Sequence, residues 1–196
     1  MLGPSSGEHP GRRWLPFAIV GGVIVLLALF GASRYNALVN QREAVDSSWA
    51  QVQNVLQRRA DLIPNLVTTV KGYAAHEKEV FEHVADARAK LAGARTPAEA
   101  TAASSALDGA LARLMVVVEA YPQLKASENF VRLQDELAGT ENRIAVERMR
   151  YNEIVRDYDQ TIKRFPSSLF AGLFGFSAKD YFQADATAQH VPEVKF

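Results

Sequence analysis

A run of twenty residues near the start of the chain, from Trp14 to Ser33, contains no charged side chain. An α-helix rises about 1.5 Å per residue, so this run measures about 30 Å, which matches the hydrocarbon core of a bilayer. Because a backbone in lipid must satisfy its own hydrogen bonds, the run is predicted to be helical. The sequence therefore predicts a transmembrane helix over residues 14–33, preceded by a polar segment over residues 1–13.

Large apolar and aromatic side chains along this run form the predicted membrane anchor, namely Trp14, Phe17, Ile19, Val23, Leu26, Leu29 and Phe30. The alternative is a cleaved signal peptide, with Arg12 and Arg13 as its basic n-region. A retained anchor is favoured, because the run is long for a signal peptide and small residues are poorly placed for cleavage. We therefore expect a single-pass protein of the cell membrane that contacts the lipid bilayer through this helix.

The side of the membrane that carries the rest of the chain stays open at this stage. Arg12 and Arg13 precede the span, and Arg34 and Arg42 follow it. The positive-inside rule therefore leans only slightly toward an N-terminus on the inside.

Composition excludes several classes of function. Lys plus Arg and Asp plus Glu number 22 each, so no net charge favours nucleic acid as a partner. The chain contains no cysteine, which excludes disulfides, thiolate metal sites, a cysteine nucleophile and a lipoprotein anchor. The residues after the span are numerous enough to form one domain with its own core.

Apolar residues after the span recur at three- and four-residue spacing, as in a coiled coil. The first seam consists of Tyr35, Leu38, Val45, Trp49, Val52 and Leu56. The stretch from Leu62 to Asn65 is expected to end this helix, because a residue before proline is pushed away from the helical conformation. Further helices are predicted over about residues 63–91, 97–121 and 127–164.

The sharpest local signal is the sequence Thr96-Pro-Ala-Glu99. A threonine N-cap, a proline in the first turn and a glutamate three residues after the cap together form a capping box. A helix is therefore predicted to begin at Pro97.

These observations predict an all-α fold, in which the transmembrane helix continues into an antiparallel, up-down four-helix bundle over residues 34–164. In this arrangement the turns near residues 62–64 and 122–127 form the tip far from the membrane. The end of the fourth helix then returns to the bilayer.

The C-terminal tail, residues 165–196, is predicted to be irregular and rich in aromatic residues. Its low charge allows three interpretations: it lies in the membrane interface, it docks a partner, or it folds back over the end of the bundle. The last is favoured, because aromatic residues near a chain end usually pack on their own domain. Phe170, Phe174 and Phe176 are candidate contact residues if the tail docks a partner.

Two further groups of residues are candidate sites. His76, Glu79 and His83 have the spacing of one helix face and are weak candidates for metal ligands, although a solvated charged face fits them better. Arg58, Arg59 and Asp61, with Pro64, are expected at the far tip, either as partner contacts or as a charged helix end. No phosphate-binding loop, G-x-S-x-G or H-E-x-x-H motif is present, so we predict no catalytic residue and no cofactor.

The sequence from Arg58 to Val67, RRADLIPNLV, followed by Val70-Lys-Gly-Tyr-Ala74, resembles the LemA family. Further positions carry the same resemblance from about residue 20 to the end of the chain, among them Glu119-Ala-Tyr-Pro122, Glu141-Asn-Arg-Ile144 and Phe174-Gly-Phe176. The resemblance implies a bacterial membrane protein with one N-terminal span and a helical bundle. It implies no established activity and brings no catalytic residues.

The favoured hypothesis is a non-enzymatic scaffold or adaptor that holds unidentified protein partners at the membrane. The alternative is a membrane-tethered sensor of a ligand or metal that uses His76, Glu79 and His83. The exposed seam of the first helix also allows a homo-oligomer.

Overall fold

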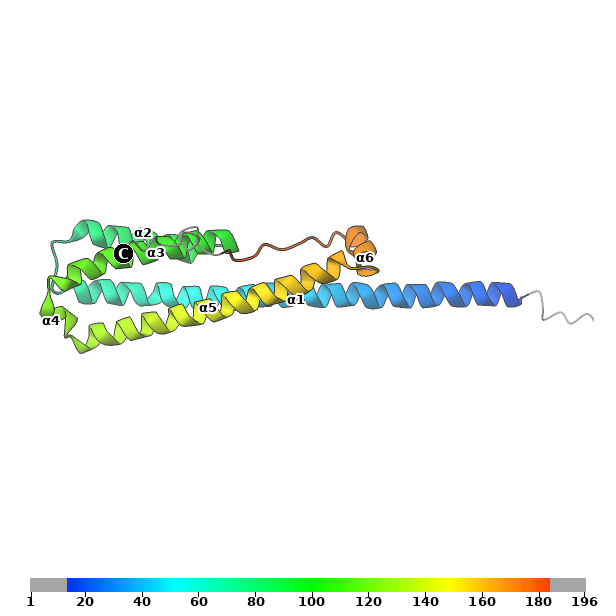
Figure 1. The fold of residues 1–196 in the computed structure, drawn as a ribbon, viewed down its shortest axis with the longest axis horizontal. Coiled ribbons are helices and arrows are strands. Elements are labelled where there is room, and N and C mark those ends of the chain that lie inside the picture. The colour runs from blue at the N-terminus through cyan, green and yellow to red at the C-terminus, as the bar shows by residue number, and fades with distance from the viewer. Residues whose placement is uncertain (1–13, 184–196) are drawn as a thin grey trace, which may run out of the picture.

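One helix of 57 residues organises the protein, α1 (Leu15–Lys71). The computed structural model describes residues 14–183, and these contain helices and connecting segments without a strand. At about 1.5 Å per residue, α1 is about 85 Å long. Its N-terminal part projects alone beyond the other helices, and the rest packs against them (Figure 1). No break separates the predicted span from the helix that follows it.

Five further helices follow α1: α2 (Lys78–Gly93), α3 (Pro97–Glu119), the single turn α4 (Pro122–Lys125), α5 (Glu128–Lys163) and α6 (Ser167–Phe174). α5 is the main packing partner of α1, whereas α2 pairs with α3 and also lies against α1. α4 lies at the end of the molecule opposite the projecting part of α1 (Figure 1). The predicted all-helical class and long apolar N-terminal helix are therefore confirmed.

The predicted apolar seam of α1 forms the core with α5. Leu38, Val45, Val52 and Leu56 are buried, at the spacing that the sequence indicates. Facing them, α5 buries a stripe of its own: Phe130, Leu133, Ile144, Tyr151, Val155, Tyr158 and Ile162. Burial of these two stripes against each other explains why two long amphipathic helices pair here.

The predicted break at residues 62–65 is wrong. α1 continues through Pro64 to Lys71, and the chain turns only between Gly72 and Glu77. Residues 63–71, which the sequence places in a second helix, are the last turns of α1. The sequence rule fails here because a contact distant in the chain offsets the cost of the proline.

That contact is a hydrogen bond from Arg88 on α2. Proline has no backbone N–H, so Pro64 leaves the carbonyl of Ala60 without its partner within the helix. Ala60 is fully buried, and the Arg88 Nε donates to its carbonyl oxygen at 2.8 Å. A buried carbonyl without a partner is costly, so Arg88 stabilises both the helix through Pro64 and the packing of α2 on α1.

A double-mutant cycle tests this compensation. Arg88→Met is expected to lower the free energy of unfolding by about 1.5 kcal/mol, because it removes the Arg88 hydrogen bond to the freed carbonyl. In a Pro64→Ala background the restored N–H of residue 64 bonds the carbonyl, and the cost should fall below about 0.5 kcal/mol. Urea denaturation of the full chain in detergent, followed by circular dichroism, measures both values. Equal costs in the two backgrounds would contradict the explanation.

The capping box at the start of α3 is confirmed. Glu99 donates its backbone N–H to the Thr96 hydroxyl oxygen at 3.2 Å. The Glu99 carboxylate in turn accepts a hydrogen bond from the backbone N–H of Arg95 at 2.7 Å, one residue before the cap. This local motif fixes the turn between α2 and α3.

Candidate functional site

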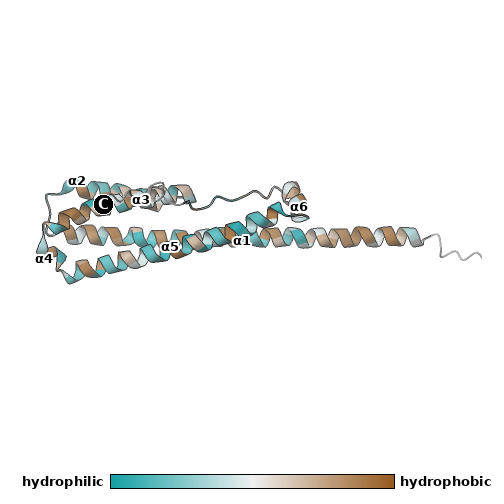
Figure 2. Cartoon of the chain, viewed as in Figure 1, coloured by the Kyte–Doolittle hydropathy of each residue, from teal (hydrophilic) through white to brown (hydrophobic). Residues whose placement is uncertain are grey.

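The projecting part of α1 is coloured mostly hydrophobic in Figure 2, and its large apolar side chains are exposed. The predicted anchor residues are all exposed, from Trp14 and Phe17 to Leu29 and Phe30. By length and composition this helix can cross a membrane, and none of its most apolar window is buried. α3 passes the same test but is partly buried, against α2. The N-terminal third of α1 is therefore the candidate membrane span, as predicted.

α6 lies beside the end of this candidate span. The ring of Phe170 is 6.3 Å from that of Phe30, and the ring of Phe174 is 4.9 Å from that of Tyr35. A Cβ on Gly31 would meet the Phe170 ring at 3.3 Å, so the glycine allows α6 to approach α1 closely. The tail thus begins with a short helix rather than with irregular chain.

Gly175 ends α6 in the left-handed conformation, with φ of 73°. This conformation is open to glycine without a steric penalty, and it turns the chain away from the helix axis. Phe176 then also packs against Tyr35, with the two ring centres 5.8 Å apart, and Phe176 is buried. The guanidinium of Arg42 lies 5.4 Å from the Phe176 ring centre. Of the three candidate tail phenylalanines, Phe176 is therefore part of the core.

Beyond Phe176 the tail runs back along α1 and α5. The Asn152 side-chain amide donates to the carbonyl of Phe182 and accepts from its backbone N–H, at 3.0 and 2.9 Å. The Phe182 ring packs between Trp49 of α1 and Tyr151 of α5, with ring centres 5.7 and 5.4 Å away. Lys179 adds an ion pair to Asp46 at 2.9 Å. We call residues 176–183 the strap; this part of the tail folds back over the bundle, as the favoured interpretation expects.

Burial beneath the strap changes the chemistry of Tyr151. Burial, with smaller contributions from the carboxylates of Asp180, Asp46 and Asp159, raises the pKa of the Tyr151 hydroxyl to about 12. The same hydroxyl donates to the Asp180 carbonyl at 3.0 Å, which requires its proton. The strap therefore holds Tyr151 neutral.

A pH dependence follows for Tyr151. An unfolded tyrosine ionises near pH 10, so the stability that neutral Tyr151 provides is fully present below about pH 10. It is lost as the pH rises through about 12, the pKa in the folded state. We expect Tyr151→Phe to remove the contribution of one tyrosine to the phenolate absorbance that develops near pH 12. Loss of absorbance near pH 10 instead would show that the hydroxyl is not buried.

The structure separates the residues that were expected at the far tip. Arg58, Asp61 and Pro64 are exposed, but they lie within α1 rather than in a turn. Arg59 is buried, and its guanidinium pairs with Asp108 of α3 at 2.5 Å and with Glu141 of α5 at 2.6 Å. Arg59 therefore ties three helices together and is not available to a partner.

The three candidate metal ligands do not share a helix face. His76 lies in the turn before α2, whereas Glu79 and His83 lie on α2, 3.5 Å apart and both largely exposed. Within residues 14–183, no group of three or more histidine and carboxylate side chains converges. No observation in this part of the chain therefore favours the metal-sensor alternative.

Sequence reasoning named Phe174 but not Phe165, Leu169 and Leu173, which are also exposed apolar residues of α6 and its approach. A signal for them does exist. No charged residue occurs from Phe165 to Ala178, whereas Lys163 and Arg164 come directly before this stretch.

Comparison with known proteins identifies relatives and a family. The chain is 27% identical, over 90% of its length, to Magnetosome protein MamQ of Magnetospirillum gryphiswaldense, of which 74% is covered. It is 29% identical to Magnetosome protein MamQ 2 of Paramagnetospirillum magneticum, with the same coverage. Protein LemA of Metamycoplasma hominis is 24% identical over 67% of the chain and 61% of that protein. The model of the LemA family matches residues 48–196, and the chain therefore belongs to the LemA family.

Proposed function

We propose that this protein is a non-enzymatic scaffold, anchored in the cell membrane by the N-terminal third of α1, that holds protein partners at a fixed distance from the bilayer. The observation that carries the proposal is the continuity of α1. The same unbroken helix presents an exposed apolar surface at its start and a buried seam against α5 further on.

The arrangement suits a rigid arm. Residues 34–71 of α1 extend about 55 Å beyond the uncharged run. Arg59 joins α1 to α3 and α5, Arg88 joins α2 to α1, and Lys179 ties the strap to α1. The first two ties meet α1 at the adjacent residues Arg59 and Ala60, and the third meets it 13 residues earlier, at Asp46. Together they hold α2, α3, α5 and the strap against α1.

The partner surface that we propose is the exposed face of α1 at Arg58, Asp61 and Pro64. Asp61 accepts a hydrogen bond from the Gln57 amide at 2.8 Å, so its carboxylate is held in place while remaining exposed. Both charge signs are present within one turn, which favours a polar protein surface as the partner.

Site-specific photocrosslinking in intact cells tests the scaffold. A photoreactive residue at position 58 or 61 is expected to yield a discrete adduct that stays in the membrane fraction after alkaline extraction. An adduct of twice the chain's mass would identify a second copy as the partner. Absence of adducts at both positions would argue against a partner at this surface, and release of the protein by alkaline extraction would argue against the anchor. A photoreactive residue at the buried position of Val52 is the matched control.

A further inference from the structure

We infer that α6 is a second membrane contact: it lies in the leaflet on the bundle side of the span, with its outer face against lipid acyl chains. The inference rests on the proposed function, because it takes the N-terminal third of α1 to lie in the bilayer. It adds a monotopic element that shares one leaflet with the span.

The contacts of α6 with α1 set its depth. The uncharged run ends at Ser33 and is about as long as the hydrocarbon core is thick. Phe170 meets α1 at Phe30 and Gly31, just before this end, and Phe174 meets it at Tyr35, just after. α6 therefore lies at the level where the hydrocarbon core gives way to headgroups.

The burial pattern of α6 is the reverse of that expected in water. Its inner face buries the small residues Ser167 and Ala171. Its outer face exposes 63% of Leu169 and 77% of Leu173, and the adjoining Phe165 is 80% exposed. A surface helix in water presents polar side chains outward. Apolar side chains on the outside are expected where the surroundings are lipid.

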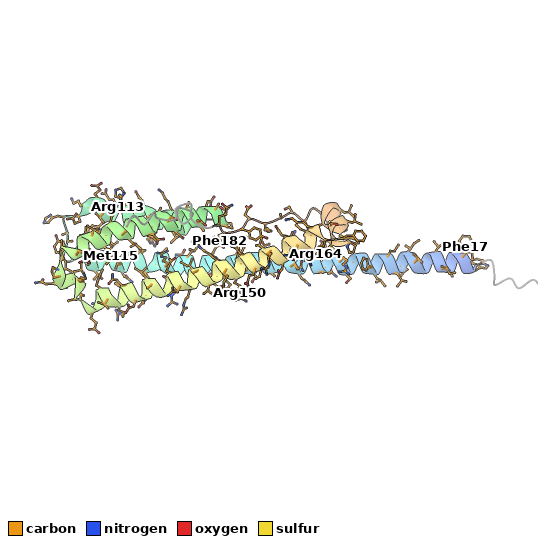
Figure 3. The ribbon with its side chains drawn as sticks, viewed as in Figure 1. Phe17, Arg113, Met115, Arg150, Arg164 and Phe182 are labelled. Carbon is orange, nitrogen blue, oxygen red and sulfur yellow. The ribbon has the colours of Figure 1, made fainter. Side chains whose placement is uncertain are left out.

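The distribution of charge fits the same level of the membrane. No charged residue occurs from Phe165 to Ala178. Lys163 and Arg164 end α5 directly before this stretch, and Figure 3 shows Arg164 beside α6. Arg34 follows the span, with its guanidinium 4.9 Å from the Phe30 ring centre. These cations would lie at the level of anionic headgroups, while the uncharged α6 beside them lies at the level of the acyl chains.

An open groove between α1 and α6 has room for an acyl chain. Its volume is about 490 Å³, and its walls carry no charged side chain. They include Leu27, Ala28, Gly31 and Ala32 from α1, and Leu173 and Phe174 from α6. The groove is continuous with the exposed face of the candidate span, so the same lipid that surrounds α1 is its natural occupant.

The absence of cysteine allows a direct test with single labels. Full-length Leu169→Cys and Leu173→Cys variants carry a fluorophore and are reconstituted into vesicles of phosphatidylcholine and phosphatidylglycerol. Lipids brominated in their acyl chains serve as quenchers. Leu26→Cys in the span is the positive control. Met149→Cys is the matched negative control, because Met149 is also apolar and 58% exposed but lies about 21 Å before the end of α5.

We expect the labels at 169 and 173 to be quenched several-fold more than the label at 149, and nearly as strongly as the label at 26. If the labels at 169 and 173 behave like that at 149 while the label at 26 is quenched, the inference about α6 is overturned and the anchor stands. If the label at 26 escapes quenching as well, the anchor itself is overturned. The two failures are thus distinguishable in one experiment.

Discussion

Replacing Asp108 and Glu141 together by asparagine and glutamine is expected to lower the free energy of unfolding by about 3 kcal/mol. Both substitutions keep the size of the side chain and remove its charge. The Arg59 guanidinium, with a side chain only 5% exposed, is then left in the interior without a counter-charge. Urea denaturation of the full chain in detergent, followed by circular dichroism, measures the loss.

The matched substitution is Arg59→Met, and it should cost much less. Asp108 and Glu141 are 52% and 46% exposed, so water can solvate their carboxylates once the arginine is gone. Methionine fills much of the vacated volume, and we expect the free energy of unfolding to fall by about 1 kcal/mol. A larger loss for Arg59→Met than for the double amide variant would contradict this assignment of burial.

Phe182→Ala is the second substitution with a large expected effect, a loss of about 3 kcal/mol. The ring of Phe182 fills the space between Trp49 and Tyr151, and the Arg148 guanidinium lies 5.2 Å from its centre. Removing the ring leaves a cavity between α1, α5 and the strap. The shift of the denaturation midpoint in the same assay reports the effect.

The neighbouring aromatic residue provides the control. Tyr181 is exposed, and Tyr181→Ala should change the free energy of unfolding by about 0.5 kcal/mol or less. Asn152→Ala, which removes both hydrogen bonds to the Phe182 backbone, should move the midpoint in the same direction as Phe182→Ala. Unchanged stability in the Phe182→Ala variant would show that the strap does not contribute to the bundle.

The parts of the fold that sequence predicts well are those set by local chemistry. The uncharged run from Trp14 to Ser33, the seam from Leu38 to Leu56 and the capping box at Thr96 each depend on residues within a few turns. Their periodicity and capping act before any distant contact forms. The structure contains a helix over this run, burial of Leu38, Val45, Val52 and Leu56 along the seam, and the capping box.

The failures share one cause, which is long-range compensation. Pro64 does not end α1, because Arg88, 24 residues later, supplies a donor to Ala60. Arg59 looks like a surface charge in the sequence and is buried, because its two counter-charges come from α3 and α5. His76 leaves the face of Glu79 and His83, because moving the end of α1 to Lys71 moves the turn as well. Local pattern carries no information about such partners.

The unbroken course of α1 makes the protein sensitive to helical phase. A helix turns by about 100° for each residue, so one residue inserted between Ser33 and Leu38 would rotate everything beyond it relative to the candidate span. Phe30 and Gly31 would then no longer point toward Phe170, while Leu38 would keep its partner on α5. The number of residues between Gly31 and Leu38 thus sets the side of α1 on which α6 packs relative to α5.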